Sequence, residues 1–137
     1  MSGRRSAYAD QAKAATREAK QIASHWATLA GAEHRPGLAN PTSTRLVREL
    51  NMRITAGLPV CRHLTGGPGV GFWVAWKPER MRCARCAHDV LAATRGTRED
   101  GRCDGCGQVV DLIHPTLLQG GSVVAILGLC GDCEAGR

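Results

Sequence analysis

Apolar residues recur at helical spacing through the first thirty residues of the chain. Residues 6–30 contain no Gly or Pro and are rich in Ala, Lys, Glu, Gln and Arg, which are good helix formers. Their apolar members follow one another at intervals of four and three residues, namely Tyr8, Ala12, Ala15, Ala19, Ile22, Trp26 and Leu29. This heptad-like spacing predicts one helix over about 6–30, with a narrow seam to which another helix could pack closely.

A second apolar stripe predicts a helix over about 44–56. Its apolar positions are Leu46, Val47, Leu50 and Ile54, and arginines occupy much of the remaining surface at Arg45, Arg48 and Arg53. Ser43 or Thr44 could cap its beginning, and Gly57 and Pro59 would end it. Residues 31–43 contain two prolines and are interpreted as a linker, so the simplest arrangement of residues 1–58 is a helical hairpin.

From residue 59 onward the hydrophobic pattern has a shorter period. Val70–Lys77 alternates as a strand, with Phe72, Val74 and Trp76 on one face and Trp73 and Ala75 on the other. A short helix over Arg85–Ala93 follows, and then two strands, Val109–His114 and Ser122–Leu127, joined by a loop that contains Pro115, Gly120 and Gly121. The expected fold class is α+β, with an N-terminal helical hairpin followed by two small β-hairpin modules.

The cysteines explain how such small modules could be stable. Six of the seven form C-x2-C pairs, Cys83/Cys86, Cys103/Cys106 and Cys130/Cys133, and the seventh, Cys61, stands two residues before His63. These eight side chains suffice for two tetrahedral zinc sites, one of three cysteines and a histidine and one of four cysteines. Four protein ligands leave no open position for water, so both zinc ions would be structural.

Two choices about the ligands remain open at this point. Sequential pairing joins Cys61/His63 to Cys83/Cys86 and Cys103/Cys106 to Cys130/Cys133, whereas a cross-brace would interleave the pairs. The intervening segments of 19 and 23 residues each have room for a hairpin, which favours sequential pairing. His88, two residues after Cys86, is the rival of His63 as the eighth ligand.

The cysteine motifs resemble two known zinc folds. RCDGCGQVV and GLCGDC, within residues 102–134, resemble a zinc ribbon, and VCRHL with MRCARCAHDVLAA, within residues 60–93, is similar to a treble-clef zinc finger. The resemblance implies two zinc modules over 59–95 and 101–135 of a region 59–137, and it implies no particular activity. The composition is also similar in style to that of small zinc proteins of actinobacteria and their phages.

Charge and hydropathy bear on the compartment and on the partner. The longest apolar run, Val123–Leu127, is far too short to span a membrane, and residues 1–13 contain no apolar signal core, so a cytoplasmic protein is expected. Residues 1–60 carry nine Lys or Arg against four Asp or Glu, whereas residues 61–137 carry nine against eight. Since thiolates bind the metal, two zinc ions would make the second region net acidic.

Two non-enzymatic functions fit these features. The first is nucleic-acid binding, with Arg45, Arg48 and Arg53 on phosphates and Trp73 either stacking on a base or packing on the helical region. The second is a protein-interaction adaptor, including a host-interaction or phage accessory protein. It would use the seam of helix 6–30, with Trp26 at its bulky end, and could form a homodimer unless helix 44–56 covers the seam. Zincin, deaminase, Walker and Rossmann motifs are absent from the sequence, which favours a protein without catalytic activity.

Overall fold

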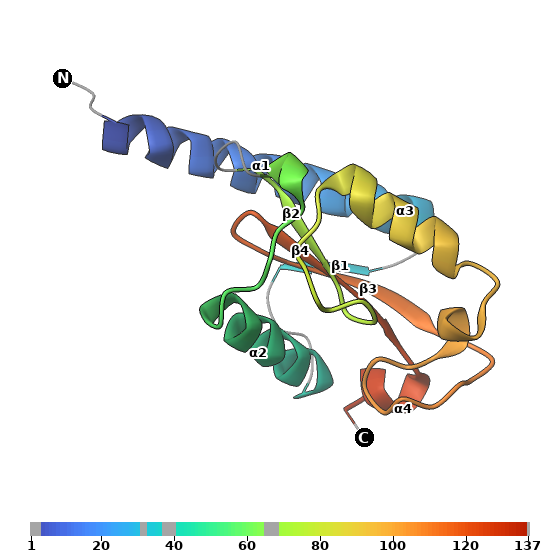
Figure 1. The fold of residues 1–137 in the computed structure, drawn as a ribbon. Helices are drawn as coiled ribbons and strands as arrows, with labels where there is room; N and C mark the ends of the chain where they lie inside the picture. Colours follow the sequence, from blue (N-terminus) through green and yellow to red (C-terminus); the bar gives the residue numbers. More distant parts are fainter. Residues whose placement is uncertain (1–3, 31–32, 37–40, 65–68, 137) are drawn as a thin grey trace.

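A four-stranded mixed sheet lies at the centre of the molecule, with helices on both faces (Figure 1). The computed structural model describes residues 4–30, 33–36, 41–64 and 69–136, and the side chains of these except 4–9, 11, 12, 26–30 and 33–36. The strands are β1 (Glu33–Pro36), β2 (Gly71–Val74), β3 (His114–Gly120) and β4 (Val123–Leu129), in the order β1-β3-β4-β2. β3 and β4 form an antiparallel hairpin, and the outer strands run parallel to their neighbours.

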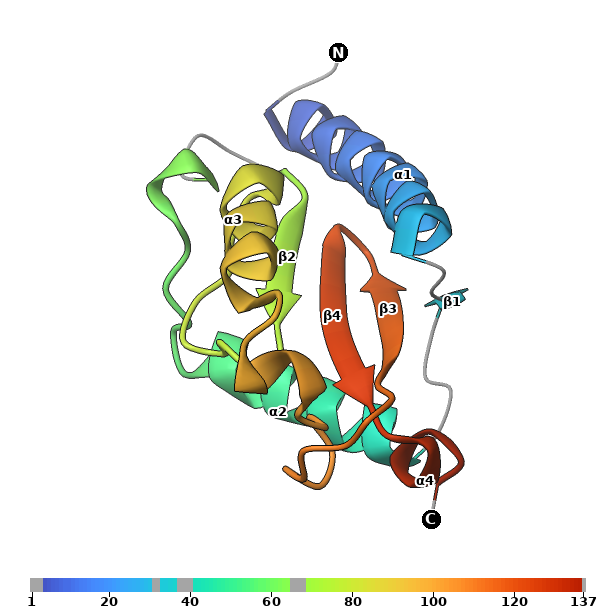
Figure 2. The same cartoon turned by 90° about the vertical axis from the view of Figure 1, so that its right-hand side faces the viewer.

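The helices divide between the two faces of this sheet. α1 (Arg4–Ala30) and α3 (Ala84–Thr94) lie side by side over one face, and α2 (Pro41–Thr55) lies across the other (Figure 2). Two 3-10 turns, η1 (Arg62–Leu64) and η2 (Arg98–Gly101), and the short α4 (Gly131–Glu134) complete the described elements. Within the described residues, no helix is both long enough and apolar enough to span a lipid bilayer.

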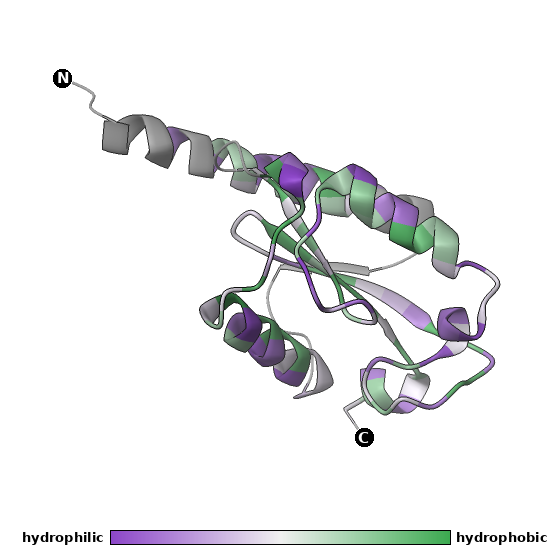
Figure 3. Cartoon of the chain, viewed as in Figure 1, coloured by the Kyte–Doolittle hydropathy of each residue, from purple (hydrophilic) through white to green (hydrophobic). Residues whose placement is uncertain are grey.

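Each face of the sheet has its own hydrophobic core. On the α1 and α3 side, Ala19 and Ala23 pack with Phe72, Val74 and Ile126. On the α2 side, a second cluster contains side chains of α2, the sheet and the cysteine region: Leu46, Leu50, Trp73, Met81, Cys103, Leu118, Ala125, Leu127, Leu129, Cys130 and Cys133. Hydrophobic residues accordingly follow the central strands and the sheet-facing side of α2 (Figure 3). The alternation expected for Val70–Lys77 is confirmed, because Phe72 and Val74 face one core and Trp73 faces the other.

The predicted helices are present, but the predicted helical hairpin is wrong. α1 and α2 pack on opposite faces of the sheet, because the apolar side chains of each helix contact strands and not the other helix. Part of the expected linker, Glu33–Pro36, is itself the edge strand β1, and α2 starts at Pro41, three residues earlier than expected. Proline is favoured in the first turn of a helix because its missing N–H has no partner there.

The two expected β-hairpin modules are also not separate units. β2, from the first module, pairs in parallel with β4, from the second, so both cysteine regions contribute to one sheet. Outside this sheet, β2 forms only a single bridge, between Phe72 and Arg82, and the described residues of the first module therefore lack the expected hairpin. The treble-clef resemblance is thus limited to a cysteine pair followed by α3.

One strand prediction, that for Val109–His114, is wrong. Val109–His114 contributes only an isolated bridge from Val109 to Arg102, and the strand begins where that segment was expected to end, at His114. Pro115 lies in the strand opposite Gly128, and the hairpin turns at Gly121, whose φ of 55° is left-handed and suits glycine.

Candidate metal centres

The first group of metal-binding side chains lies between η1 and the beginning of α3. Cys61 and His63 approach from the segment that follows α2, Cys83 caps the N-terminus of α3, and Cys86 lies in its first turn. The four donor atoms lie within 4.8 Å of one another. His63 Nδ1 is 3.3 Å from Cys86 Sγ and 3.7 Å from Cys83 Sγ. Cys61 is buried and His63 is exposed, so the first cluster has one buried and one open side.

The second group of metal-binding side chains lies at the open end of the β3–β4 hairpin, between the segment that follows η2 and the segment that follows β4. Cys103 and Cys106 precede β3, whereas Cys130 and Cys133 follow β4, and Cys130 caps α4. Their four sulfurs lie within 4.8 Å of one another, and Cys106 Sγ is 3.9 Å from Cys130 Sγ. Three of the four are buried and belong to the α2-side core, and only Cys106 is exposed.

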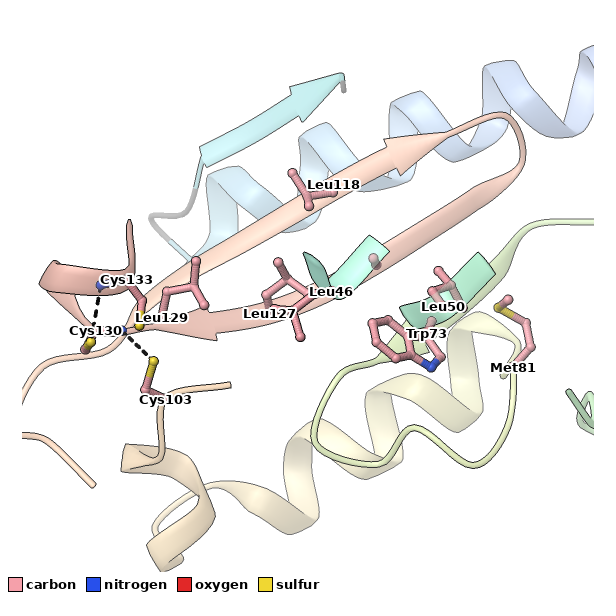
Figure 4. Close-up of a cluster of buried hydrophobic side chains, with 11 residues drawn as sticks. Leu46, Leu50, Trp73, Met81, Cys103, Leu118, Leu127, Leu129, Cys130 and Cys133 are labelled. Carbon is pink, nitrogen blue, oxygen red and sulfur yellow. Dashed lines mark hydrogen bonds between the residues drawn. The ribbon is translucent and has the colours of Figure 1, made fainter. Parts of the chain in front are cut away.

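Backbone amides point at the sulfurs of both clusters. In the first, Cys83 N–H donates to Cys61 Sγ over 3.2 Å and Cys86 N–H donates to Cys83 Sγ over 3.5 Å. In the second, Gly105 N–H and Cys130 N–H donate to Cys103 Sγ, each over 3.3 Å, and Cys133 N–H donates to Cys130 Sγ over 3.5 Å. The last two bonds are drawn in Figure 4. Such bonds stabilise negative charge on sulfur, the form in which cysteine binds metal.

The spacing of the donors fits a tetrahedral ion better than a disulfide. Sulfurs around a zinc ion with Zn–S bonds of about 2.3 Å lie roughly 3.8 Å apart, close to the 3.9 Å between Cys106 Sγ and Cys130 Sγ. A disulfide needs about 2.05 Å, and all seven cysteines are free. The chain therefore has two clusters that could each hold a metal ion, and their soft sulfur donors favour zinc.

The thiols within each cluster have unequal pKa values. Burial raises the pKa of Cys61, but hydrogen bonds from the Cys83 backbone and from His63 outweigh burial and lower it to about 7. Burial also raises the pKa of Cys103, but hydrogen bonds from the backbone amides of Cys130, Cys106 and Gly105 outweigh burial and lower it to about 7. Each cluster therefore has one thiol that ionises near neutral pH.

The other resolved shifts go upward, because burial and hydrogen bonds with neighbouring thiols favour the protonated form. A hydrogen bond with Cys83, burial, and the charges of Cys83 and Cys61 raise the pKa of Cys86 to about 11. Burial and the neighbouring thiols raise the pKa of Cys133 to about 12. For Cys106, a bond from the Gln108 backbone lowers the pKa, but burial and neighbouring thiols shift it upward overall. A divalent cation would offset these effects by binding the thiolates, three in the first cluster and four in the second.

The structure settles both choices that the sequence left open about which side chains meet. It brings together the sequential sets, Cys61, His63, Cys83 and Cys86, and Cys103, Cys106, Cys130 and Cys133, and not the cross-braced ones. His63 joins the first set, whereas His88 is exposed on α3 and belongs to neither set.

The expected binding residues differ in their exposure and in their bonding partners. Trp73, considered for base stacking, is completely buried against α2 and donates its indole N–H to Pro78 O over 3.2 Å, so the packing alternative is correct. Arg45 donates to Gly105 O, and Arg53 donates to Glu49 Oε1 over 3.0 Å. Arg48 is exposed. The side chain of Trp26 lies outside the described residues.

Sequence reasoning missed the groups that hold the second cluster from outside. Asp104 Oδ2 accepts a 2.7 Å bond from Gly128 N–H, which ties the first cysteine pair to the end of β4. Burial raises the pKa of Asp104 to about 6, despite the bond from Gly128, and Asp104 borders a hollow of about 370 Å³ beside α3. Gly105 lies so close to Thr42 of α2 that a Cβ at Gly105 would lie 2.7 Å from Thr42 Cγ2. The sign of these contacts in the sequence is the pair Asp104 and Gly105 between Cys103 and Cys106.

Comparison with known proteins adds no relative to this picture. No protein-family model matches the chain, and neither a curated protein nor a solved structure is significantly similar to it. The functional interpretation therefore depends on the geometry of the two metal-binding clusters.

Proposed function

We propose that the protein is a non-enzymatic zinc-binding protein in which two structural zinc ions hold the sheet and its helices together. The observation that carries this proposal is the pair of four-donor clusters, each with donor atoms within 4.8 Å of one another. Four protein donors complete a tetrahedral shell, so neither ion would have a position for water or substrate. The amides directed at the sulfurs support a permanent structural role, since they favour the metal-bound thiolates.

Elemental analysis of protein produced without added metal tests this proposal. Two zinc ions per chain are expected, and cobalt substitution should give the absorption of tetrahedral thiolate sites. A ratio near one, or iron with visible absorption, would contradict the assignment.

The partner that we propose is nucleic acid, bound through the solvent face of α1. Lys13, Arg17 and Lys20 are exposed, and their spacing of four and three residues places them along one stripe of the helix. This stripe is rotated by roughly 130° around the helix from the buried Ala15, Ala19 and Ala23, which face the sheet. Glu18 is displaced from Arg17 by the roughly 100° between successive residues, whereas the exposed Asp10, three residues before Lys13, is the one described acid on this stripe.

Binding of fluorescent DNA and RNA at increasing salt concentration tests this role. We expect a steep loss of affinity with salt, and we expect Lys13→Gln, Arg17→Gln and Lys20→Gln together to flatten the slope by up to about three units. Arg48→Gln is the matched control, because Arg48 is exposed on α2 across the sheet. Unchanged binding by the triple variant would remove α1 from the interface.

A protein-interaction adaptor is the second candidate, favoured by apolar side chains on α2. Met52 is 67% exposed and Ile54 is 45% exposed, and Ile54 borders an apolar groove of about 280 Å³ between α2 and the β3–β4 hairpin. The homodimer proposed through helix 6–30 is less favoured, because Ala15 and Ala19 of its seam are buried within the chain. Absence of nucleic-acid binding at low salt would leave the adaptor as the better interpretation.

A further inference from the structure

The first two turns of α2 contact both cysteine pairs of the second cluster. Thr42 Oγ1 donates a 3.1 Å hydrogen bond to the carbonyl oxygen of Cys133, and the Arg45 guanidinium donates to the carbonyl oxygen of Gly105. Gly105 belongs to the pair that precedes β3, whereas Cys133 belongs to the pair that follows β4. One short stretch of helix therefore joins the two halves of the cluster.

The fit between α2 and the cluster leaves no room for a side chain at Gly105. A Cβ at that position would lie 2.7 Å from Thr42 Cγ2 and 2.8 Å from Cys133 Sγ, closer than real Cβ contacts. Gly136, just beyond the second pair, also lies near Pro41, where a Cβ would make a tight contact of 3.2 Å with Pro41 Cδ. The start of α2 is thus in direct contact with the backbone around the sulfurs.

The two residues that α2 holds also bond to the sulfurs. Gly105 donates its N–H to Cys103 Sγ over 3.3 Å and offers its carbonyl to Arg45. Cys133 donates its N–H to Cys130 Sγ over 3.5 Å and offers its carbonyl to Thr42. Each held carbonyl is separated from the donating amide by the φ and ψ of one residue, so α2 restricts the backbone conformation of Gly105 and Cys133 and with it the direction of both amides.

Charge and packing act in the same direction. A zinc ion bound by four thiolates carries a net charge of about −2, and the guanidinium of Arg45 is a permanent positive charge bonded to the cluster's own backbone. Leu46 and Leu50, which follow on α2, pack in the same hydrophobic core as Cys103, Cys130 and Cys133. Movement of α2 away from the sheet would therefore expose the cluster and break its outer hydrogen bonds together.

We propose that α2 is the outer shell of the second metal site, with Arg45 and Thr42 as positioning residues that retard metal release and couple the metal to the docking of α2. This inference depends on zinc binding as proposed above. Outer-shell partners of metal ligands typically change metal affinity by about 10- to 100-fold when removed. The same helix that sequence reasoning assigned to phosphate contacts would then serve the metal.

The test measures zinc release to an excess of chelator, followed through amide signals in ¹H–¹⁵N spectra. Gly105 and Cys133 report on the second site, and Cys86 reports on the first site as an internal reference. We expect Arg45→Met to speed release from the second site by about tenfold and Thr42→Val by about fivefold, with the first site unchanged. Arg45→Lys should be intermediate, because it keeps the charge and one donor but loses the planar fork.

Arg48→Met is the matched control, since it removes the same charge from the same helix at an exposed position. Equal release from Arg45→Met and Arg48→Met, or equal acceleration at both sites, would overturn the inference, because the latter indicates only general destabilisation. If Arg45→Met does not fold, Thr42→Val and Arg45→Lys give the same comparison. A parent protein that binds no zinc would instead refute the proposed function.

Discussion

His63 is the exposed member of the first cluster, and it is the donor that the sequence placed least firmly. Its Nδ1 lies 3.3 Å from Cys86 Sγ. His88, two residues after Cys86, belongs to neither cluster. We expect His63→Ala to weaken zinc binding at the first site by at least about tenfold, because three thiolates remain, while the second site keeps its zinc. Chelator competition measures both sites, and His88→Ala is the control. Loss of zinc in His88→Ala alone would exclude His63 as the ligand.

The unequal thiol pKa values predict how zinc binding depends on pH. In the second cluster the pKa of Cys133 is about 12 and that of Cys106 is shifted upward from its usual value, so both thiols are protonated at pH 7 without metal. Zinc must displace these protons, and its apparent affinity should therefore fall as the pH is lowered, by at least about a hundredfold per unit near neutrality. Proton release on adding zinc in weak buffer checks the count, and release of fewer than two protons at this site would contradict it.

At the scale of elements, α1 depends on small residues to approach the sheet. Ala19 and Ala23 are fully buried against the core that contains Phe72, Val74 and Ile126. Leucine at position 19 would overfill this contact, and we expect Ala19→Leu to lower the free energy of unfolding by about 1–3 kcal/mol. Ala14→Leu is the control, since Ala14 is exposed on the same helix. Denaturant unfolding measures both variants, and equal stability would place the seam of α1 elsewhere.

At the scale of the whole molecule, the second metal cluster and the main core are one unit. Cys103, Cys130 and Cys133 pack in the same cluster as Trp73 and the leucines of α2, as Figure 4 shows. This core joins residues from both sides of the division expected at residues 58 and 59. Structural zinc contributes roughly 10–16 kcal/mol of apparent binding free energy, which is as large as the entire stability of a typical domain.

We therefore expect Cys103→Ser, or removal of zinc by a chelator, to unfold more than the cysteine region. The indole N–H signal of Trp73, which is bonded to Pro78 O, should lose its native position together with the signals of α2. NMR spectra recorded during chelation would show this as one cooperative change. A native Trp73 signal after the cysteine signals have changed would instead support two independent regions.

Local patterns in the sequence predicted the helices, one strand's two faces and the groups of metal donors. The periods of the apolar residues predicted α1 and α2, and the C-x2-C spacing predicted two groups of metal donors, because a helix face and a cysteine pair each form within a few residues. The alternation around Phe72 and Trp73 correctly predicted opposite faces of a strand. The strand predicted at Val109–His114 failed because strand boundaries depend on the partner, and β4 pairs from His114 onward.

Only the tertiary structure decided what each face meets. An apolar stripe specifies that a helix must pack but not against what, so the seam of α1 and the stripe of α2 could not show that a sheet would lie between them. The same limitation applies to Arg45, since a cationic side chain on a helix has the same sequence signal whether it binds a phosphate or the carbonyl of Gly105. The parallel pairing of β2 with β4 joins segments about fifty residues apart, and long-range contacts of this kind leave no periodic pattern in the sequence.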